Sequence, residues 1–125
     1  MTVTREEMTL LDLATGDYYN IWEAACQLAK TSISETYDVS VARARRVLLS
    51  MQSKGLIKFY KYSCQRRDHQ EIAADEVTAA LDQYMNWDPD DVNNLQFQIK
   101  FSSTESGNTA YEQLWHTVME SPATS

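Results

Sequence analysis

The fold is decided by the stretch SETYDVSVARARRVLLSMQSKGLI, which runs from Ser34 to Ile57. Asp38 or Ser40 is placed to cap a helix over VARARRVLLSMQSK, and Gly55 stands at the position where helices commonly end in a left-handed residue. One side of this helix is an apolar stripe of Val41, Ala44, Val47, Leu48 and Met51. The opposite side is small, polar or basic, with Ala42, Arg43, Arg46, Ser50 and Ser53. One face is therefore expected to pack and the other to remain open.

After Gly55 the period of the pattern changes from 3.6 residues to two. The segment LIKFYKY, residues 56–62, is rich in aromatic and β-branched side chains and predicts a strand. One register buries Ile57 and Phe59, and the other buries Leu56, Tyr60 and Tyr62. We favour the first beyond Leu56, because it leaves Lys58 in solvent.

Two further helices are predicted before this stretch. Thr4 and Glu7 form a capping box for a short helix that ends near Ala14. Gly16 ends the helical pattern, and Asp17 is a suitable N-cap for a second helix over 18–30, with Trp22 as a core residue. Ser32 or Ser34 is expected to open a short helical turn after it.

The second half of the chain predicts a tip, a helix, a strand and a last helix. The polar stretch 63–70 forms the tip, and residues 73–87 form a helix with Val77, Leu81 and Tyr84 on one face. The segment LQFQIKF alternates so regularly that its apolar residues share one face of a strand, namely Leu95, Phe97, Ile99 and Phe101. Thr104 caps the last helix, which has Ala110, Tyr111, Leu114 and Val118 at helical spacing. The tail 121–125 is expected to be disordered.

Length and composition predict one folded, mostly helical domain over residues 1–120. The chain has 125 residues, 43% of them hydrophobic, with only 3 Gly and 2 Pro. No apolar run is long enough to span a bilayer, and the acids of Met1–Leu10 do not suit a signal peptide, so a cytoplasmic location is expected. Cys26 and Cys64 lie outside any CxxC or His cluster, which favours free thiols over a disulfide or a metal site.

The charge of the chain is divided between two regions. Val39 to Arg67 holds eight Lys and Arg residues and no Asp or Glu. That segment carries +8, which leaves −15 for the rest of a chain whose total is −7. A low overall pI argues against nucleic-acid binding, but a local basic cluster matters more to a polyanion than the total does. An ordinary solvated basic face that balances the acidic remainder is the alternative.

The order of these elements resembles the winged helix-turn-helix superfamily of bacterial regulators, such as the MarR and PadR families. Met51–Ile57 matches their Leu-x-x-x-Gly-Leu-Ile phrase, and FSSTESGNTAYEQL resembles their last wing strand and the helix start after it. The resemblance covers residues 17 to 115 and implies an α+β fold, mostly helical, with a small antiparallel wing sheet. One departure is an insertion of about 63–94, including a helix, between the wing strands. This insertion leaves room for a protein partner.

The resemblance implies a transcriptional regulator that binds double-stranded DNA with the helix over 40–54. The residues nearest the base edges are Ser40, Ala42 and Arg43. Those expected to hold phosphates are Arg45, Arg46, Lys58, Arg66 and Arg67. For each arginine taken alone, solvation or pairing with an acid elsewhere is the better explanation; only the acid-free cluster favours DNA. The alternative is a winged-helix module that binds a protein and not DNA.

Other functional classes have little support in the sequence. His69 lies in the polar tip and His116 in the last helix, without a catalytic or metal-binding motif, so neither an enzyme nor a cofactor is expected. The acids of DPDD lack the spacing of an EF-hand loop. Tyr18, Tyr19 and Trp22 are expected in the core rather than around a ligand. Apolar residues near both ends predict a homodimer, namely Leu10, Leu11, Leu114, Trp115 and Val118.

Overall fold

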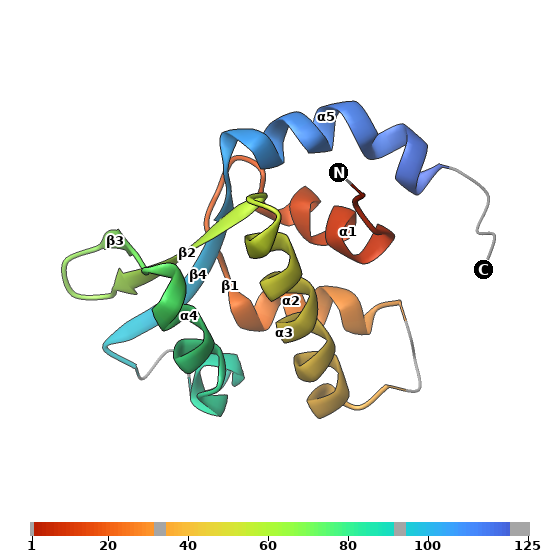
Figure 1. Cartoon of the computed structure of the whole chain (residues 1–125). Helices are drawn as coiled ribbons and strands as arrows, with labels where there is room; N and C mark the ends of the chain where they lie inside the picture. The colour runs from red at the N-terminus through yellow and green to blue at the C-terminus, as the bar shows by residue number, and fades with distance from the viewer. Residues whose placement is uncertain (1, 32–34, 92–94, 121–125) are drawn as a thin grey trace.

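The computed structural model describes residues 2–31, 35–91 and 95–120. Within these ranges five α-helices and one 3-10 turn accompany a four-stranded antiparallel sheet, which makes an α+β fold (Figure 1). The elements in chain order are α1 (Arg5–Ala14), β1 (Tyr19–Asn20), α2 (Ile21–Ala29), α3 (Tyr37–Ser53), β2 (Ile57–Ser63), β3 (Asp68–Glu71), α4 (Ala74–Leu81), η1 (Tyr84–Trp87), β4 (Phe97–Ser103) and α5 (Glu105–Met119).

The two longest strands, β2 and β4, form the centre of the sheet, whose order is β1-β4-β2-β3. They pair antiparallel, from Ile57 opposite Ser103 to Ser63 opposite Phe97. β1 adds two residues at the β4 edge, and β3 returns along the far half of β2. The prediction of a plain polar tip over 63–70 is therefore wrong, because residues 68–71 pair with β2 as a strand.

One face of the sheet packs against helices and holds the core. Ile57 and Phe59 on β2 and Ile99 and Phe101 on β4 are buried on this face, whereas Lys58 is exposed. The predicted register of β2 is confirmed, and so is the shared face of Phe97, Ile99 and Phe101, whereas Leu95 lies before the start of β4. The helices supply the rest of the core, chiefly Leu10, Leu11, Ile21, Leu28, Leu48 and Met51.

The second helix begins at Ile21 and not at Tyr18. Tyr19 and Asn20 are extended, because they pair with Phe101 and Lys100 of β4. Asn20 occupies the N-cap position, and its N–H donates to Glu23 Oε2 at 2.8 Å. The prediction that Asp17 caps this helix is therefore wrong.

Helix α3 begins earlier than the sequence predicts. Thr36 is the N-cap, and its Oγ1 accepts a hydrogen bond from the Val39 N–H at 3.3 Å. Asp38 and Ser40 are consequently inside the helix and do not cap it. Gly55 follows the C-cap with φ +75°, as predicted. The short turn predicted at Ser32 or Ser34 falls on 32–34, outside the described residues.

The inserted helix is shorter than predicted, because the chain folds back on itself after Leu81. The Trp87 indole N–H donates to the Leu81 carbonyl at 2.8 Å, and the Asn86 amide donates to the Ala80 carbonyl at 2.9 Å. These bonds satisfy carbonyls that the end of α4 leaves open and hold η1 against it. Tyr84 is 53% exposed and does not share the buried face of Val77 and Leu81.

The last helix is capped as predicted. Thr104 Oγ1 accepts a hydrogen bond from the Gly107 N–H at 3.0 Å and donates to the Gly55 carbonyl at 2.6 Å. This side chain therefore joins the start of α5 to the turn that ends α3. α5 lies across α1 at one side of the molecule (Figure 1). The tail 121–125 lies outside the described residues.

Candidate nucleic-acid interface

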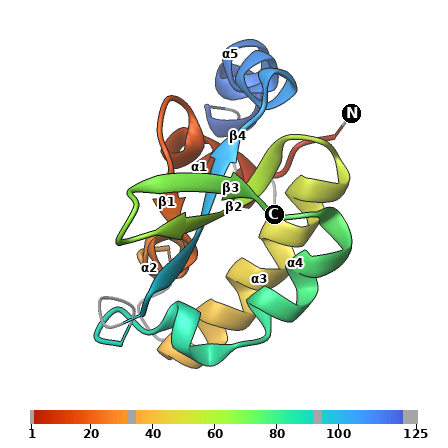
Figure 2. The ribbon, with the colours of Figure 1, turned by 90° about the vertical axis from the view of Figure 1, so that its left-hand side faces the viewer.

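Five of the eight residues predicted to contact DNA lie on α3, but the structure separates them. Figure 2 shows α4 running alongside α3. One side of α3 therefore faces α4, and another side is open to solvent. The exposed side chains of α3 are Asp38, Val39, Ala42, Arg46 and Ser53, and we call the last four the α3 outer face. Val39 is 52% exposed and was not singled out in the sequence. Its spacing of three from Ala42 and seven from Arg46 is the signal that places it there.

Ser40 does not lie on the α3 outer face. It is fully buried, and its hydroxyl donates to Glu35 Oε2 at 2.8 Å. The helix starts at Tyr37, which turns Ser40 toward the core side together with Ala44. In this conformation Ser40 is closed off from a base edge and serves to hold Glu35 in place.

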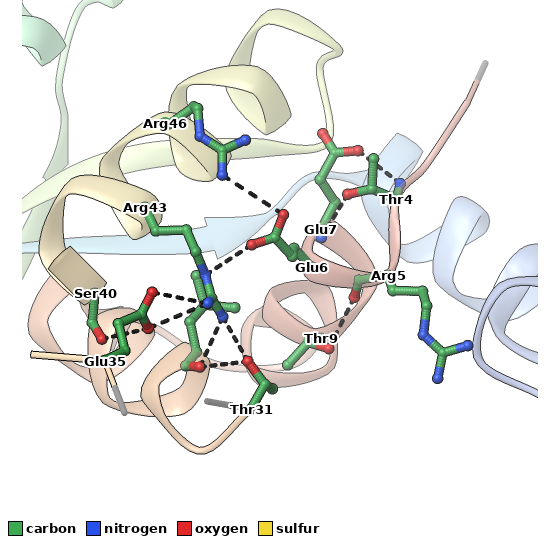
Figure 3. Close-up of polar contacts among 11 residues, drawn as sticks. Thr4, Arg5, Glu6, Glu7, Thr9, Thr31, Glu35, Ser40, Arg43 and Arg46 are labelled. Carbon is green, nitrogen blue, oxygen red and sulfur yellow. Dashed lines mark hydrogen bonds and ion pairs between the residues drawn. The ribbon is translucent and has the colours of Figure 1, made fainter. Parts of the chain in front are cut away.

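Arg43 is the centre of a polar network that joins three parts of the chain (Figure 3). Its guanidinium donates to both Glu35 carboxylate oxygens, at 3.0 and 3.2 Å, and forms an ion pair with Glu6 of α1 at 2.8 Å. It also donates to the Leu28 carbonyl at 2.8 Å and to Thr31 Oγ1 at 2.6 Å. Only 18% of the side chain is exposed. Arg43 therefore ties α3 to α1 and to the end of α2.

Arg46 is the opposite case. Its side chain is 68% exposed, and its contact with a carboxylate is a long one of 3.8 Å to Glu6 Oε1. Figure 3 shows it on the same helix as Arg43 but turned away from the Glu35 cluster. An exposed pair at this distance is worth little energy. Arg46 is consequently free to exchange Glu6 for a phosphate or a base.

Arg45 connects α3 to the inserted helix. Its Nε and one terminal nitrogen lie 2.9 and 2.8 Å from Asp82 Oδ1. Tyr37 of α3 donates its hydroxyl proton to the Trp87 carbonyl, and burial raises the pKa of this phenol. Between α3 and the α4–η1 segment lies an open groove of about 540 Å³, lined in part by Val41, Ala42, Leu81, Tyr84 and Trp87.

The remaining basic residues lie on the sheet. Lys58 forms an exposed ion pair with Glu71 at 3.2 Å, and Arg66 lies 3.6 Å from Asp68. Arg67 occupies the turn between β2 and β3 with φ +57°, and makes no ion pair with a described residue. β2 has seven residues, so this turn is roughly 20 Å from the end of α3. It projects from the side of the molecule away from α3 (Figure 1).

Lys54, also in the basic segment, is held by a buried acid. Its Nζ lies 2.7 Å from Oε1 of Glu7, whose other oxygen accepts from the Ser50 hydroxyl at 2.9 Å. Burial alone raises the pKa of Glu7, but the bonds from Lys54, Thr4 and Ser50 outweigh it and lower the pKa below its ordinary value. Glu7 is therefore charged, and it anchors α1 to the end of α3.

An aromatic cluster on the outer face of the sheet was not predicted. The ring of His69 stacks on Tyr18, with 3.8 Å between centroids, and lies 4.7 Å from the ring of Tyr62. Tyr60 packs edge-on against Tyr18 at 4.9 Å. The prediction that His69 lies in a polar tip is wrong, because β3 brings it beside β2, where it is half-buried.

Acidification is expected to destabilise the protein through His69. Burial and then Lys100 lower the pKa of His69 from 6.5, and Asp17 and Asp68 oppose them only in part. His69 therefore binds a proton more readily in the unfolded chain than in the folded one. The stability that the neutral imidazole contributes is complete above pH 6.5 and is lost as the pH falls from there through the lowered pKa. The thermal midpoint of His69→Phe should decline less between pH 7 and pH 5 than that of the parent. His116→Gln, which alters an exposed histidine, should decline as the parent does.

The described residues hold no metal-ligand cluster and no membrane-spanning helix. No three His, Cys, Asp or Glu side chains in ranges 2–31, 35–91 and 95–120 gather to hold a metal ion. Cys26 and Cys64 are free thiols, half-buried and exposed respectively. No described helix combines the length and the apolar character needed to cross a bilayer.

No protein-family model, curated protein or solved structure matches this chain. Of the residues predicted to contact DNA, Ala42 and Arg46 lie together on the α3 outer face. Ser40 and Arg43 instead form hydrogen bonds and ion pairs within the protein. Arg66 and Arg67 lie far from α3.

Proposed function

We propose that the chain is a winged helix-turn-helix protein that binds double-stranded DNA with the α3 outer face. In this arrangement α2 and α3 form the helix-turn-helix, β2 and β4 are the wing strands, and β3, α4 and η1 are an insertion between them. The neighbouring positions of β1, β4 and β2 in the sheet support the proposal, since β4 pairs with β2 across the whole insertion.

The observation that carries the proposal is the composition of the α3 outer face. Arg46 is an exposed cation with only a weak intramolecular partner, and the small side chains of Ala42 and Ser53 flank it along the helix. Small residues allow a helix to approach base edges closely, and arginine makes the commonest specific contact, to guanine. A phosphate must displace the carboxylate partners of Arg45, Lys58 and Arg66, so we propose these residues, together with Arg67, as weaker, outer phosphate contacts.

The test is a salt titration of duplex binding with Arg46→Glu. We expect the variant to bind duplexes at least about tenfold more weakly at about 0.1 M salt, and the slope of log affinity against log salt to flatten by about 1. The matched control is the double variant Thr109→Glu with Gln113→Glu on exposed positions of α5, which makes the same total change in charge away from α3. Arg46→Glu and the parent binding equally well, with the fold intact, would refute the DNA-binding role.

A protein-interaction module is the second candidate, favoured by one specific observation. Val39, Tyr84 and Met85 are each about half exposed, and Tyr84 lines the groove between α3 and α4 beside Asp38 and Asp82. Large exposed apolar side chains near one groove are typical of protein contacts. This candidate predicts no duplex binding at moderate salt, so the same titration separates the two.

A homodimer remains a prediction. Leu10 and Leu11 are fully buried in the core, so the assignment of these two residues to an exposed apolar surface is wrong. Leu114, Trp115 and Val118 of α5 are half-buried and pack against the core. The apolar surface left for a dimer is therefore smaller than the sequence suggests, and it lies on α5 alone.

A further inference from the structure

Different helices pack against the core-facing side of the sheet at its two ends. Near α3 and α5, Phe59 and Phe101 are fully buried. Toward the other end of β2 and β4, the same side of the sheet faces α4 and η1, and a cavity of about 390 Å³ opens between them. Its apolar lining is Ile72, Ala80, Met85, Leu95, Phe97 and Ile99. This volume lies in the range of small-molecule sites.

The cavity exists because the side of α4 that lines it is small. Val77 and Leu81, the large apolar residues of α4, are buried in the core. The side of α4 that lines the cavity presents Ala80 and, one turn earlier, Glu76. A methyl group at Ala80 cannot fill the space opposite Phe97 and Ile99. Helix α4 therefore covers this end of the sheet but leaves the cavity open.

One cation stands at the cavity without a neutralising partner. Lys61 projects from β2 on the core-facing side, opposite Ile99, and its Nζ lies 4.2 Å from the centre of the Phe97 ring. No carboxylate of the described residues forms an ion pair with it, although every other Lys or Arg of α3 and β2 has one. Glu76 lines the same cavity but makes no ion pair with Lys61. Lys61 is therefore available to an anion whose apolar part fills the cavity.

We propose that this cavity binds a small apolar molecule with one acidic group, an aromatic or short-chain carboxylate. The carboxylate contacts Lys61, and the apolar body lies against Ile72, Phe97 and Ile99. Glu76 disfavours a second negative charge and limits the ligand to a monoanion. The site is independent of duplex binding, because none of its residues belongs to the α3 outer face.

The experiment measures binding of 2-naphthoate and of its uncharged analogue 2-naphthamide by amide chemical shifts of the whole chain. Naphthoate should bind saturably and shift the resonances of Lys61, Ala80 and Ile99. Lys61→Gln should weaken naphthoate binding about fivefold and leave naphthamide unchanged, and Glu76→Gln should strengthen naphthoate binding. Both side chains are exposed, so neither change threatens the fold.

A matched pair of substitutions tests the cavity itself. Ala80→Phe should fill it and abolish binding of both probes, whereas Ala79→Phe, on the exposed neighbouring position, should leave both unchanged. Circular dichroism verifies that each variant is folded, and if Ala80→Phe is not, the smaller Ala80→Val takes its place. Shifts confined to residues outside the cavity, or an equal effect of Lys61→Gln on both probes, would overturn the proposal.

Discussion

Replacing Arg43 by glutamate is expected to lower the free energy of unfolding by about 3 kcal/mol or more. The substitution removes the bonds of the guanidinium to Glu35, Leu28 and Thr31 and places a third carboxylate beside Glu35 and Glu6. The site is largely buried, so water does not compensate the repulsion. Urea denaturation at pH 7, monitored by far-ultraviolet circular dichroism, measures the difference.

The matched control is the same substitution at Arg46, one turn away on α3. Its side chain is mostly exposed, so we expect a change within about 0.5 kcal/mol. Equal destabilisation by the two variants would mean that the network around Arg43 contributes no more than a surface contact does. A duplex-binding defect in Arg43→Glu would not by itself identify a DNA contact, because the orientation of α3 depends on this residue.

Replacing Gly107 by alanine is expected to destabilise the protein by about 3 kcal/mol, although alanine is the better helix former. A Cβ at Gly107 would lie 2.1 Å from the Leu56 carbonyl oxygen and 3.3 Å from Leu11 Cδ2. The Leu56 carbonyl cannot move aside freely, because it accepts the Thr104 N–H at 3.0 Å. The helix must therefore shift away from the core or lose its cap.

Thermal unfolding of Gly107→Ala and of Ser106→Ala checks this expectation. Ser106 is the exposed neighbour in the same turn of α5, so its substitution should change the midpoint little. In an isolated helix the glycine substitution would stabilise by up to about 1 kcal/mol. A raised midpoint for Gly107→Ala would therefore contradict the close approach of α5 to Leu56.

Several elements of the fold follow from signals within a few residues. The capping box of Thr4 and Glu7, the left-handed Gly55, and the Thr104 cap all lie where the sequence predicts them. The alternation of β4 also predicts its buried face correctly. Each of these features depends on bonds or side-chain periods that are local, so the sequence alone determines them.

Elements whose partners are distant in the chain were predicted less well. Tyr19 and Asn20 form a strand only because β4 lies beside them, and residues 68–71 do so only because β2 does. The early end of α4 likewise depends on Trp87 and Asn86, which return to its last carbonyls. Local propensity cannot supply these pairings, since the energy that decides them comes from tertiary contact.

The candidate site shows the same division between local and distant information. By sequence alone Arg43 and Arg46 are equivalent, because a separation of three places both on one side of α3. The positions of Glu35 and Glu6, contributed by a loop and by another helix, turn Arg43 inward and leave Arg46 in solvent. The sequence by itself determined that this segment is a basic, amphipathic helix followed by a strand. Only the tertiary structure decided which of its charges are neutralised internally, because neutralisation requires carboxylates that folding brings from elsewhere in the chain.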